Sequence, residues 1–338
     1  MSNITIKDIA RESGFGVSTV SRALNNHPDV SEEAKAKIQA VIDQYNFVPN
    51  NNAKKLKQQV ALNIAVIIKG RFNSLFSSIV ETMHERITHY GYHSEAHFLD
   101  ENDDELKYAI KVANENKPLA LIFLGGDIDS FKKDFEQINI PSILVTNSAA
   151  SLDFDNLSSV YTDDIKAAYS AAEHLVKKGH KKIGIIGGNP QKSFTSRLRF
   201  QGCLQCFRKY NIDFHETVQY QKARFSYSSA YEAMNLLVKN NPDITAVFAM
   251  SDVMAIGAVR ALKDMGMQVP EDISVIGFDG IEITQFYNPR LTTIQQSQDK
   301  LAKRSVDILV SSIRKAKSVS HEEIPFQLIE GESVKSLV

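Results

Sequence analysis

Long apolar runs are missing from this chain, since none approaches the roughly 18 residues that a membrane-spanning helix needs. The first residues are polar and contain no apolar stretch of the kind that forms a secretory leader. We therefore expect neither a membrane anchor nor a signal peptide, and we expect a cytoplasmic protein.

Cysteine is scarce, because only Cys203 and Cys206 occur, in one C-x-x-C pair. A redox pair needs the amino end of a helix to lower a thiol pKa. This pair instead lies inside the helical stretch LRFQGCLQCFRKY, and no second pair is present to complete a zinc site. We interpret both thiols as small core residues.

The common catalytic motifs are absent as well. The chain has no G-x-x-x-x-G-K-[ST] phosphate loop, no G-x-S-x-G elbow and no H-E-x-x-H. The glycine pairs at 125–126 and 187–188 lack the rest of a dinucleotide fingerprint. His93 and His97 are four residues apart, but their segment has the pattern of a strand with solvated side chains. The sequence predicts no enzyme, no metal site and no cofactor.

Charge is present but uneven. The net charge is −1, while residues 1–60 carry eight Lys or Arg against six Asp or Glu, which is +2 and leaves −3 for the rest. Residues 50–57 form the basic patch, with three lysines and no acid. Because phosphate contacts dominate affinity for DNA, binding should depend on a dimer that doubles this patch, and should weaken with salt.

Residues 5–24 have the pattern of two short helices across a turn. Ile6, Ile9 and Ala10 follow helical spacing, and Gly14 supplies a turn residue. The second helix is expected to turn Val17, Val20 and Leu24 inward and to expose Ser18, Thr19, Ser21 and Arg22. This is the helix-turn-helix pattern, in which the start of the second helix enters the major groove. Val17 and Ser18 are then expected at base edges, with Arg22 on guanine or phosphate.

A third helix and a polar tether follow. Ser31 is a good N-cap, and Pro49 ends the helix. The tether that begins at Asn50 is too short and polar to hold a helix alone. Beside DNA its lysines gain phosphate partners, and Leu56 is expected to wedge into the minor groove.

From residue 61 the pattern changes to alternating strands and helices. Six apolar runs suit buried parallel strands: 64–68, 120–126, 142–146, 183–188, 246–251 and 273–279. Helical segments lie between them, which is typical of parallel sheets covered by helices. The expected fold is an all-α helix-turn-helix domain plus an α/β domain of two Rossmann-like subdomains. The expected domains are 1–48, a hinge at 49–60, and 61–338, divided into an N-subdomain (61–161 and 292–325) and a C-subdomain (162–291 and 326–338).

Ligands of such sheets bind outside the carboxyl ends of the strands. Several polar or aromatic residues follow those ends, and we select them as a candidate site: Asn73, Leu75, Phe76, Asn147, the segment 193–199, Ser251 and Asp279. Lys69 and Arg71 also follow a strand. They either face solvent or favour an anionic ligand.

The chain as a whole resembles the LacI (lactose and galactose repressor) family. The motifs are TIKDIA at the start, TVSRALN, VSEE at the third helix and P-N-x-x-A-x-x-L at the tether. The resemblance implies contacts to phosphates or bases from the residues that match these motifs: Thr5, Ser18, Thr19, Ser21, Asn25, Asn50, Ala53 and Leu56. Gly16 departs from the family, which usually has serine there, and Lys54 stands where arginine is common.

The resemblance also implies effector contacts. Arg197 in R-L-R matches the family's effector-binding arginine, and Asp279 in V-I-G-F-D matches its acceptor for sugar hydroxyls. Ser251 stands where asparagine is frequent, Gln296 ends T-T-I-Q-Q, and Phe225 would form an apolar wall. An arginine and an aspartate suit vicinal hydroxyls, and an aromatic face such as Phe76 suits a sugar ring. Each residue also has a structural alternative, such as a surface cation for Arg197 or a core ring for Phe76.

The expected function is a ligand-controlled repressor of carbohydrate genes. Two chains would pair through their effector domains and meet a palindromic operator, and a bound sugar would change the hinges. A dimer is favoured over a tetramer, because no leucine heptad ends the sequence. One alternative is a regulator that answers to a phosphoprotein or a phosphorylated metabolite. A sugar-binding transport protein is another, which would have a leader and no DNA-reading segment.

Overall fold

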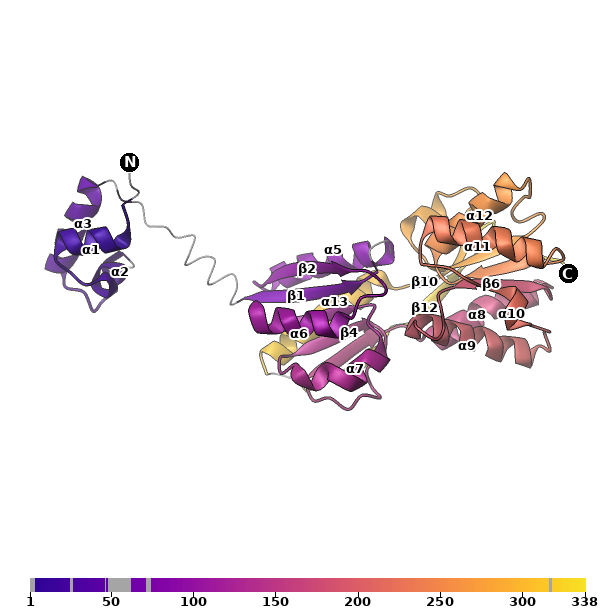
Figure 1. Cartoon of the computed structure of the whole chain (residues 1–338), viewed down its shortest axis with the longest axis horizontal. Helices are drawn as coiled ribbons and strands as arrows, with labels where there is room; N and C mark the ends of the chain where they lie inside the picture. Colours follow the sequence, from indigo (N-terminus) through magenta and orange to yellow (C-terminus); the bar gives the residue numbers. More distant parts are fainter. Residues whose placement is uncertain (1–3, 25–26, 46, 48–61, 71–73, 316–317) are drawn as a thin grey trace. The chain divides into compact units, whose positions relative to one another are not determined.

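The computed structural model describes residues 4–24, 27–45, 47, 62–70, 74–315 and 318–338. The chain divides into two compact units, residues 1–59 and 60–338, and each is described by itself (Figure 1). Among the described residues, no helix is both long enough and apolar enough to span a bilayer.

The first unit contains three helices in its described part: α1 (Ile6–Ser13), α2 (Val17–Leu24) and α3 (Glu32–Gln44). Their apolar stripes meet in a core of Ile9, Ala10, Val20, Ile38 and Ile42. The caps follow the sequence pattern. Gly14 ends α1 with a left-handed φ of 74°, and the Ser31 hydroxyl accepts a bond from the Ala34 amide at 3.3 Å. The predicted helix-turn-helix is confirmed.

The start of helix α2 is a position where a substitution should stabilise the helix-turn-helix. The Gly16 carbonyl accepts bonds from the Thr19 and Val20 amides, so Gly16 occupies the cap of α2 without a capping side chain. A Cβ there would meet nothing closer than the Ser18 hydroxyl at 3.7 Å. Gly16→Ser is therefore expected to stabilise this unit by about 0.3 kcal/mol, measured by thermal unfolding. Gly14→Ser, at a left-handed position, is the control and should destabilise it.

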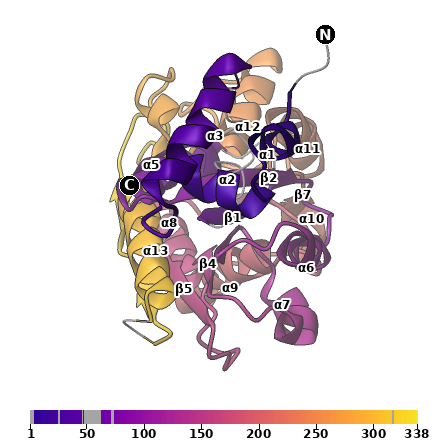
Figure 2. The same ribbon diagram turned by 90° about the vertical axis from the view of Figure 1, so that its left-hand side faces the viewer.

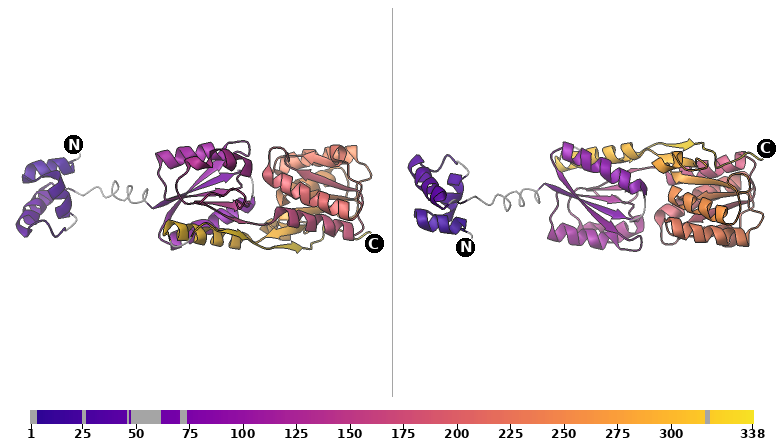
Figure 3. Two further views of the ribbon diagram at one scale, coloured as in Figure 1. Left: turned by 90° about the horizontal axis from the view of Figure 1, so that it is seen from below. Right: turned by 90° about the horizontal axis from the view of Figure 1, so that it is seen from above.

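The second unit consists of two α/β lobes, shown side by side in Figure 3. Within the described residues, the first lobe has a parallel sheet in the order β11-β5-β4-β3-β1-β2. Its strands are β1 (Asn63–Lys69), β2 (His93–Leu99), β3 (Ala120–Leu124), β4 (Ser142–Thr146), β5 (Leu157–Tyr161) and β11 (His321–Glu323). Its helices are α5 (Ser74–His89), α6 (Glu105–Glu115), α7 (Ile128–Asp134), the 3-10 turn η1 (Phe135–Gln137) and α13 (Gln298–Ile313).

Helices cover both faces of that sheet, which explains why its central strands β1, β3 and β4 are mainly apolar and buried, while the edge strands β2 and β11 are polar and more exposed. Successive residues of β1 point to opposite faces. Ile64, Val66 and Ile68 join a cluster under α5 and α13, while Ala65 and Ile67 join a cluster under α6 and α7. Figure 2 shows these two helix pairs on opposite sides of the sheet.

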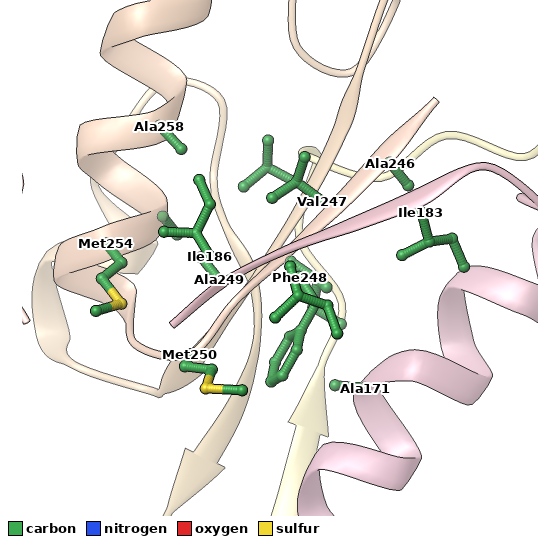
Figure 4. Packing of buried hydrophobic residues seen from close by; sticks show 14 of the residues in the cluster. Ala171, Ile183, Ile186, Ala246, Val247, Phe248, Ala249, Met250, Met254 and Ala258 are labelled. Carbon is green, nitrogen blue, oxygen red and sulfur yellow. The ribbon is translucent and has the colours of Figure 1, made fainter. Parts of the chain in front are cut away.

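The second lobe has the order β12-β10-β9-β8-β6-β7, parallel except for β12. Its strands are β6 (Ile183–Gly187), β7 (Tyr220–Lys222), β8 (Ala246–Ala249), β9 (Ser274–Asp279), β10 (Thr292–Gln296) and β12 (Phe326–Ile329). Its helices are α8 (Asp164–Lys177), α9 (Phe194–Lys209), α10 (Glu216–Gln219), α11 (Tyr227–Asn240), α12 (Asp252–Asp264) and the 3-10 turn η2 (Glu282–Gln285). Figure 4 shows part of its core, where Phe248 and Met250 pack among small residues such as Ala171.

Two details bear on the sequence predictions. Residues 292–296, placed with the N-subdomain from the sequence, instead pair with β9 as strand β10 of the second lobe. The polar TTIQQ pattern has no apolar run, but four of its five side chains are buried in the sheet. Cys203 and Cys206 are fully buried, and burial raises the pKa of the Cys206 thiol to about 12. Their prediction as core residues is confirmed.

Candidate functional site

A cavity of about 770 Å³ lies between the two lobes of the second unit. The first lobe contributes the loops that follow β1, β2 and β3. The second lobe contributes the start of α9, the loop between β7 and α11, and Gln296 at the end of β10. The cavity therefore lies at the carboxyl ends of the strands, where sheets of this kind bind ligands.

Aromatic side chains from both lobes form its apolar wall. Leu75 and Phe76 come from the start of α5, and Phe194, Phe225 and Tyr227 come from the second lobe. The position of the Phe76 ring requires glycine at residue 125. A Cβ there would lie 2.8 Å from the ring, and the φ of 82° also disfavours other residues.

A buried arginine lies at the polar end of the cavity. Arg199, only 5% exposed, donates from Nε to Asp164 Oδ1 at 2.8 Å and from Nη1 to the Met250 carbonyl. Its guanidinium also lies 3.6 Å from the centre of the Phe278 ring. These contacts fix the orientation of the arginine and leave part of its donor set facing the cavity, which Arg199 and Asp164 both line.

Two further carboxylates lie behind this arginine. Asp279 Oδ1 is 3.7 Å from Arg199 Nη1 and accepts a bond from Gln296 Nε2 at 2.9 Å. Burial raises the pKa of Asp279 to about 7, although Arg199 and Gln296 act to lower it. Burial, together with the charge of Asp279, also holds the pKa of Asp252 well above its usual range. This region is therefore rich in acid and holds a single buried cation among the described residues.

The raised pKa of Asp279 predicts that stability depends on pH. A carboxyl whose folded pKa lies above its unfolded value of 3.8 stabilises the fold at low pH, and that contribution disappears as pH rises through about 7. We expect this contribution to the melting temperature to fall as pH rises from about 4 to about 7 and to change little above that. Asp279→Asn should reduce this slope without abolishing it, because the pKa of Asp252 shifts in the same direction. Equal slopes in the wild type and the variant would contradict the assignment.

Lys69, the cation at the end of β1 in the first lobe, is already neutralised by a carboxylate. Lys69 Nζ lies 2.5 Å from Glu105 Oε2, and Glu105 is 1% exposed. The other oxygen of Glu105 accepts the Asp127 amide at 2.7 Å. Lys69 is therefore not free to bind an anionic ligand. Arg71, the other cation considered from the sequence, lies outside the described residues.

The structure brings together only some of the predicted effector residues. Leu75, Phe76, Phe225 and Gln296 line the cavity. Asn147, Ser251 and Asp279 are buried beside it: the Ser251 hydroxyl caps α12, and Asn147 donates to the Gly126 carbonyl at 2.8 Å. Asn73 lies outside the described residues.

Arg197 does not line the cavity. It is partly exposed and pairs with Asp129 of the first lobe at 2.7 Å. Arg199 takes the place expected for it, because residues two apart on a helix point to nearly opposite sides. Only the periodicity of α9 distinguishes the two arginines of R-L-R in the sequence. Asp164 was also missed, as was the group Asp100, Glu101 and Arg224 at the cavity edge.

The predicted DNA-contacting residues of the first unit lie on or near its surface. Thr5, Val17, Ser18 and Arg22 are exposed, and Thr19 and Ser21 are half-buried. Val17 was expected to face inward and also to reach bases, and at 42% exposure it faces outward. Its place at the start of α2 leaves it outside the core that Val20 anchors. Asn25, Asn50, Ala53 and Leu56 lie outside the described residues.

Comparison with known proteins extends these observations. The family model described as "Bacterial regulatory proteins, lacI family" matches residues 5–50, and that described as "Periplasmic binding protein-like domain" matches residues 172–334. The HTH-type transcriptional regulator MalR of Clostridium butyricum is 37% identical over 336 residues, 98% of this chain and 99% of the relative. The HTH-type transcriptional repressor PurR of Haemophilus influenzae is 32% identical over 99% of both chains.

Solved structures agree with the fold. The Lac repressor dimer bound to operator and the anti-inducer ONPF has a TM-score of 0.75 and 25% identity, covering 99% of this chain and 100% of that one. The complex of the transcriptional regulator CelR with cellobiose has a TM-score of 0.72 and 22% identity, covering 98% and 99%. These relatives are transcriptional regulators and not enzymes. With two relatives above 30% identity over nearly its whole length, the chain belongs to the lacI family of bacterial regulatory proteins.

Proposed function

We propose that the protein is a DNA-binding repressor of carbohydrate-utilisation genes whose affinity for its operator is controlled by a neutral sugar in the interlobe cavity. The observation that carries the proposal is the character of that cavity. It combines aromatic walls with charges that are already paired, Lys69 with Glu105 and Arg199 with Asp164. Such a site suits a ligand with an apolar ring face and many hydroxyls but no net charge.

The DNA-binding part of the proposal rests on the first unit. Helix α2 presents Val17, Ser18 and Arg22 at the surface, where they could contact base edges and phosphates. The Lac repressor structure is a dimer bound to operator. By analogy, two copies of this chain would place two α2 helices on the half-sites of a palindrome.

The proposal of a neutral sugar rests on the paired charges of the cavity and, less strongly, on the ligands of two structures with the same fold. The CelR structure is a complex with cellobiose, and a LacI-family regulator from Enterococcus faecium is a complex with ribose. Both are under 25% identical to this chain, so they support a sugar only as the kind of ligand that the fold accepts. A phosphorylated metabolite is the alternative, and the neutralised Lys69 argues against it.

Two measurements test the proposal. Isothermal titration of the full chain with glucose, maltose, cellobiose and lactose should identify at least one binder, and glucose 6-phosphate should bind more weakly. The binder should then change the affinity for a palindromic duplex selected from random sequence. Tighter binding of the phosphate would favour the alternative ligand class. Failure to prefer any palindrome over random duplex would contradict the whole proposal.

A further inference from the structure

Opposite charges meet across the edge of the cavity. Arg224 lies in the second lobe, between β7 and α11, and Asp100 and Glu101 follow β2 in the first lobe. The Nε of Arg224 donates to Glu101 Oε1 at 2.5 Å, and its Nη2 donates to Asp100 Oδ2 at 2.7 Å. One guanidinium thus binds two carboxylates on the opposite lobe, and all three residues line the cavity.

Both sides of this contact are held in position by their own loops. The second carboxylate oxygen of Asp100, Oδ1, accepts bonds from the backbone and side-chain amides of Asn102. The backbone amide of Asp100 donates to the Asp103 carboxylate at 2.8 Å. The Arg224 amide donates to the Ser229 hydroxyl at 2.9 Å. Because these loops already restrain Asp100 and Arg224, forming the ion pair costs less conformational entropy than it would between two mobile surface side chains. Hydrogen bonding to Arg224 lowers the pKa of Asp100, so this carboxyl stays ionised over the neutral range.

In the described part of the chain, the other ion pairs between the lobes also place the cation on the second lobe and the acid on the first. Arg197 of the second lobe binds Asp129 at 2.7 Å, and Lys166 of the second lobe binds Glu323 at 3.1 Å. Lys166 and Glu323 lie next to two of the three places where the chain crosses between lobes, after β5 and before β12. That pair can persist when the lobes separate. The Arg224 and Arg197 pairs must break, because they join segments that only lobe closure brings together.

Apolar contacts also reach across the cleft. Val253 and Ile281 of the second lobe are buried in the core cluster that underlies α5 and α13, and Phe194 packs against the cluster under α6 and α7. These contacts do not depend on salt in the way ion pairs do. The charged contacts at the cavity edge are half-exposed and should be screened.

We propose that Arg224, Asp100 and Glu101 form an electrostatic latch that favours the closed arrangement of the two lobes. The latch makes the ratio of open to closed lobes depend on ionic strength, and it controls access to the cavity at the residues that line its edge. Breaking it should raise the open-to-closed ratio about three- to tenfold, as expected for one guanidinium shared by two partly exposed carboxylates. The inference holds whatever the ligand is, and its test uses neither ligand nor DNA.

Because the chain contains no tryptophan, the fluorescence of one introduced tryptophan would report on lobe opening alone. Phe194→Trp places a single indole where the second lobe packs against the first. Acrylamide quenching of its fluorescence should rise as NaCl is raised from about 20 to 500 mM, because salt screens the latch and opens the cleft. In the same background, Arg224→Gln should show high quenching already at low salt and a weaker dependence on salt. Asp100→Asn with Glu101→Gln should reproduce that behaviour from the other lobe.

The matched control is Arg290→Gln. Arg290 binds Glu332 at 3.0 Å with similar exposure, but both residues belong to the second lobe, so its loss should leave quenching unchanged. Arg224→Glu combined with Asp100→Arg and Glu101→Arg should restore low quenching, which no general loss of stability could do. The latch is refuted if Arg224→Gln and Arg290→Gln behave alike, or if quenching of the parent protein does not change with salt.

Discussion

Replacing Arg199 with methionine is expected to weaken binding of the effector strongly and to destabilise the second unit. The variant leaves the Asp164 carboxylate, only 4% exposed, without its charged partner and leaves the Met250 carbonyl without its donor. Removal of one member of a buried ion pair costs about 3 to 5 kcal/mol. Loss of the charge-assisted hydrogen bonds that Arg199 could make to a ligand should weaken binding about 100-fold.

The control for that experiment lies two residues away. Arg197→Met removes an arginine of the same helix, but its side chain is 39% exposed and pairs with Asp129 outside the cavity. We expect a change in stability within about 1 kcal/mol and, because this pair also joins the two lobes, a change in ligand affinity of at most about fivefold. Chemical unfolding and titration with the sugar found in the panel measure both effects. Equal losses in the two variants would mean that Arg199 is not the ligand-facing arginine.

Replacing Glu105 with glutamine is expected to change which ligand the cavity prefers. The substitution keeps an acceptor for the Asp127 amide and removes the charge that neutralises Lys69. Lys69 would then be a partly buried cation without its charged partner, at a cost of up to about 3 kcal/mol in stability. A phosphorylated sugar could supply the missing negative charge, so its affinity should rise by about tenfold or more while that of the neutral sugar falls.

Lys69→Met with Glu105→Gln is the matched control for this switch. The double variant removes both charges, so it should recover stability and show no preference for the phosphate. Titration of glucose and glucose 6-phosphate against the three proteins measures the effect. If Glu105→Gln gains nothing for the phosphate, Lys69 does not face the space in which a ligand would lie.

Much of the architecture could be predicted because it depends on local patterns. The runs from Ile64 and from Ile183 are apolar at every position, since helices cover both faces of each sheet. Short strands with polar residues were harder to predict from the sequence. β10 consists of Thr and Gln around one Ile, and only its position between β9 and β12 buries it.

The site was less predictable, because its geometry is non-local. The strand-end rule and the family resemblance selected Phe76, Phe225 and Gln296, and all three line the cavity. Neither could select Arg224, whose partners are 123 and 124 residues away in the sequence. Arg199 differs from Arg197 only in the direction in which α9 turns it, which depends on how that helix packs against α8.

The order of strands in the two sheets has a consequence for biosynthesis. Near the end of the chain, β10 belongs to the second sheet, and α13 then packs on the first sheet. The last two strands are divided between the lobes, because β11 joins the first sheet and β12 joins the second. On the ribosome, therefore, neither sheet can acquire its last strand until residues 321–329 have been translated and have left the exit tunnel. A nascent chain that is stalled earlier would carry two unfinished sheets, each with an unprotected edge to which other chains could bind, so the two lobes should reach their native state together and late.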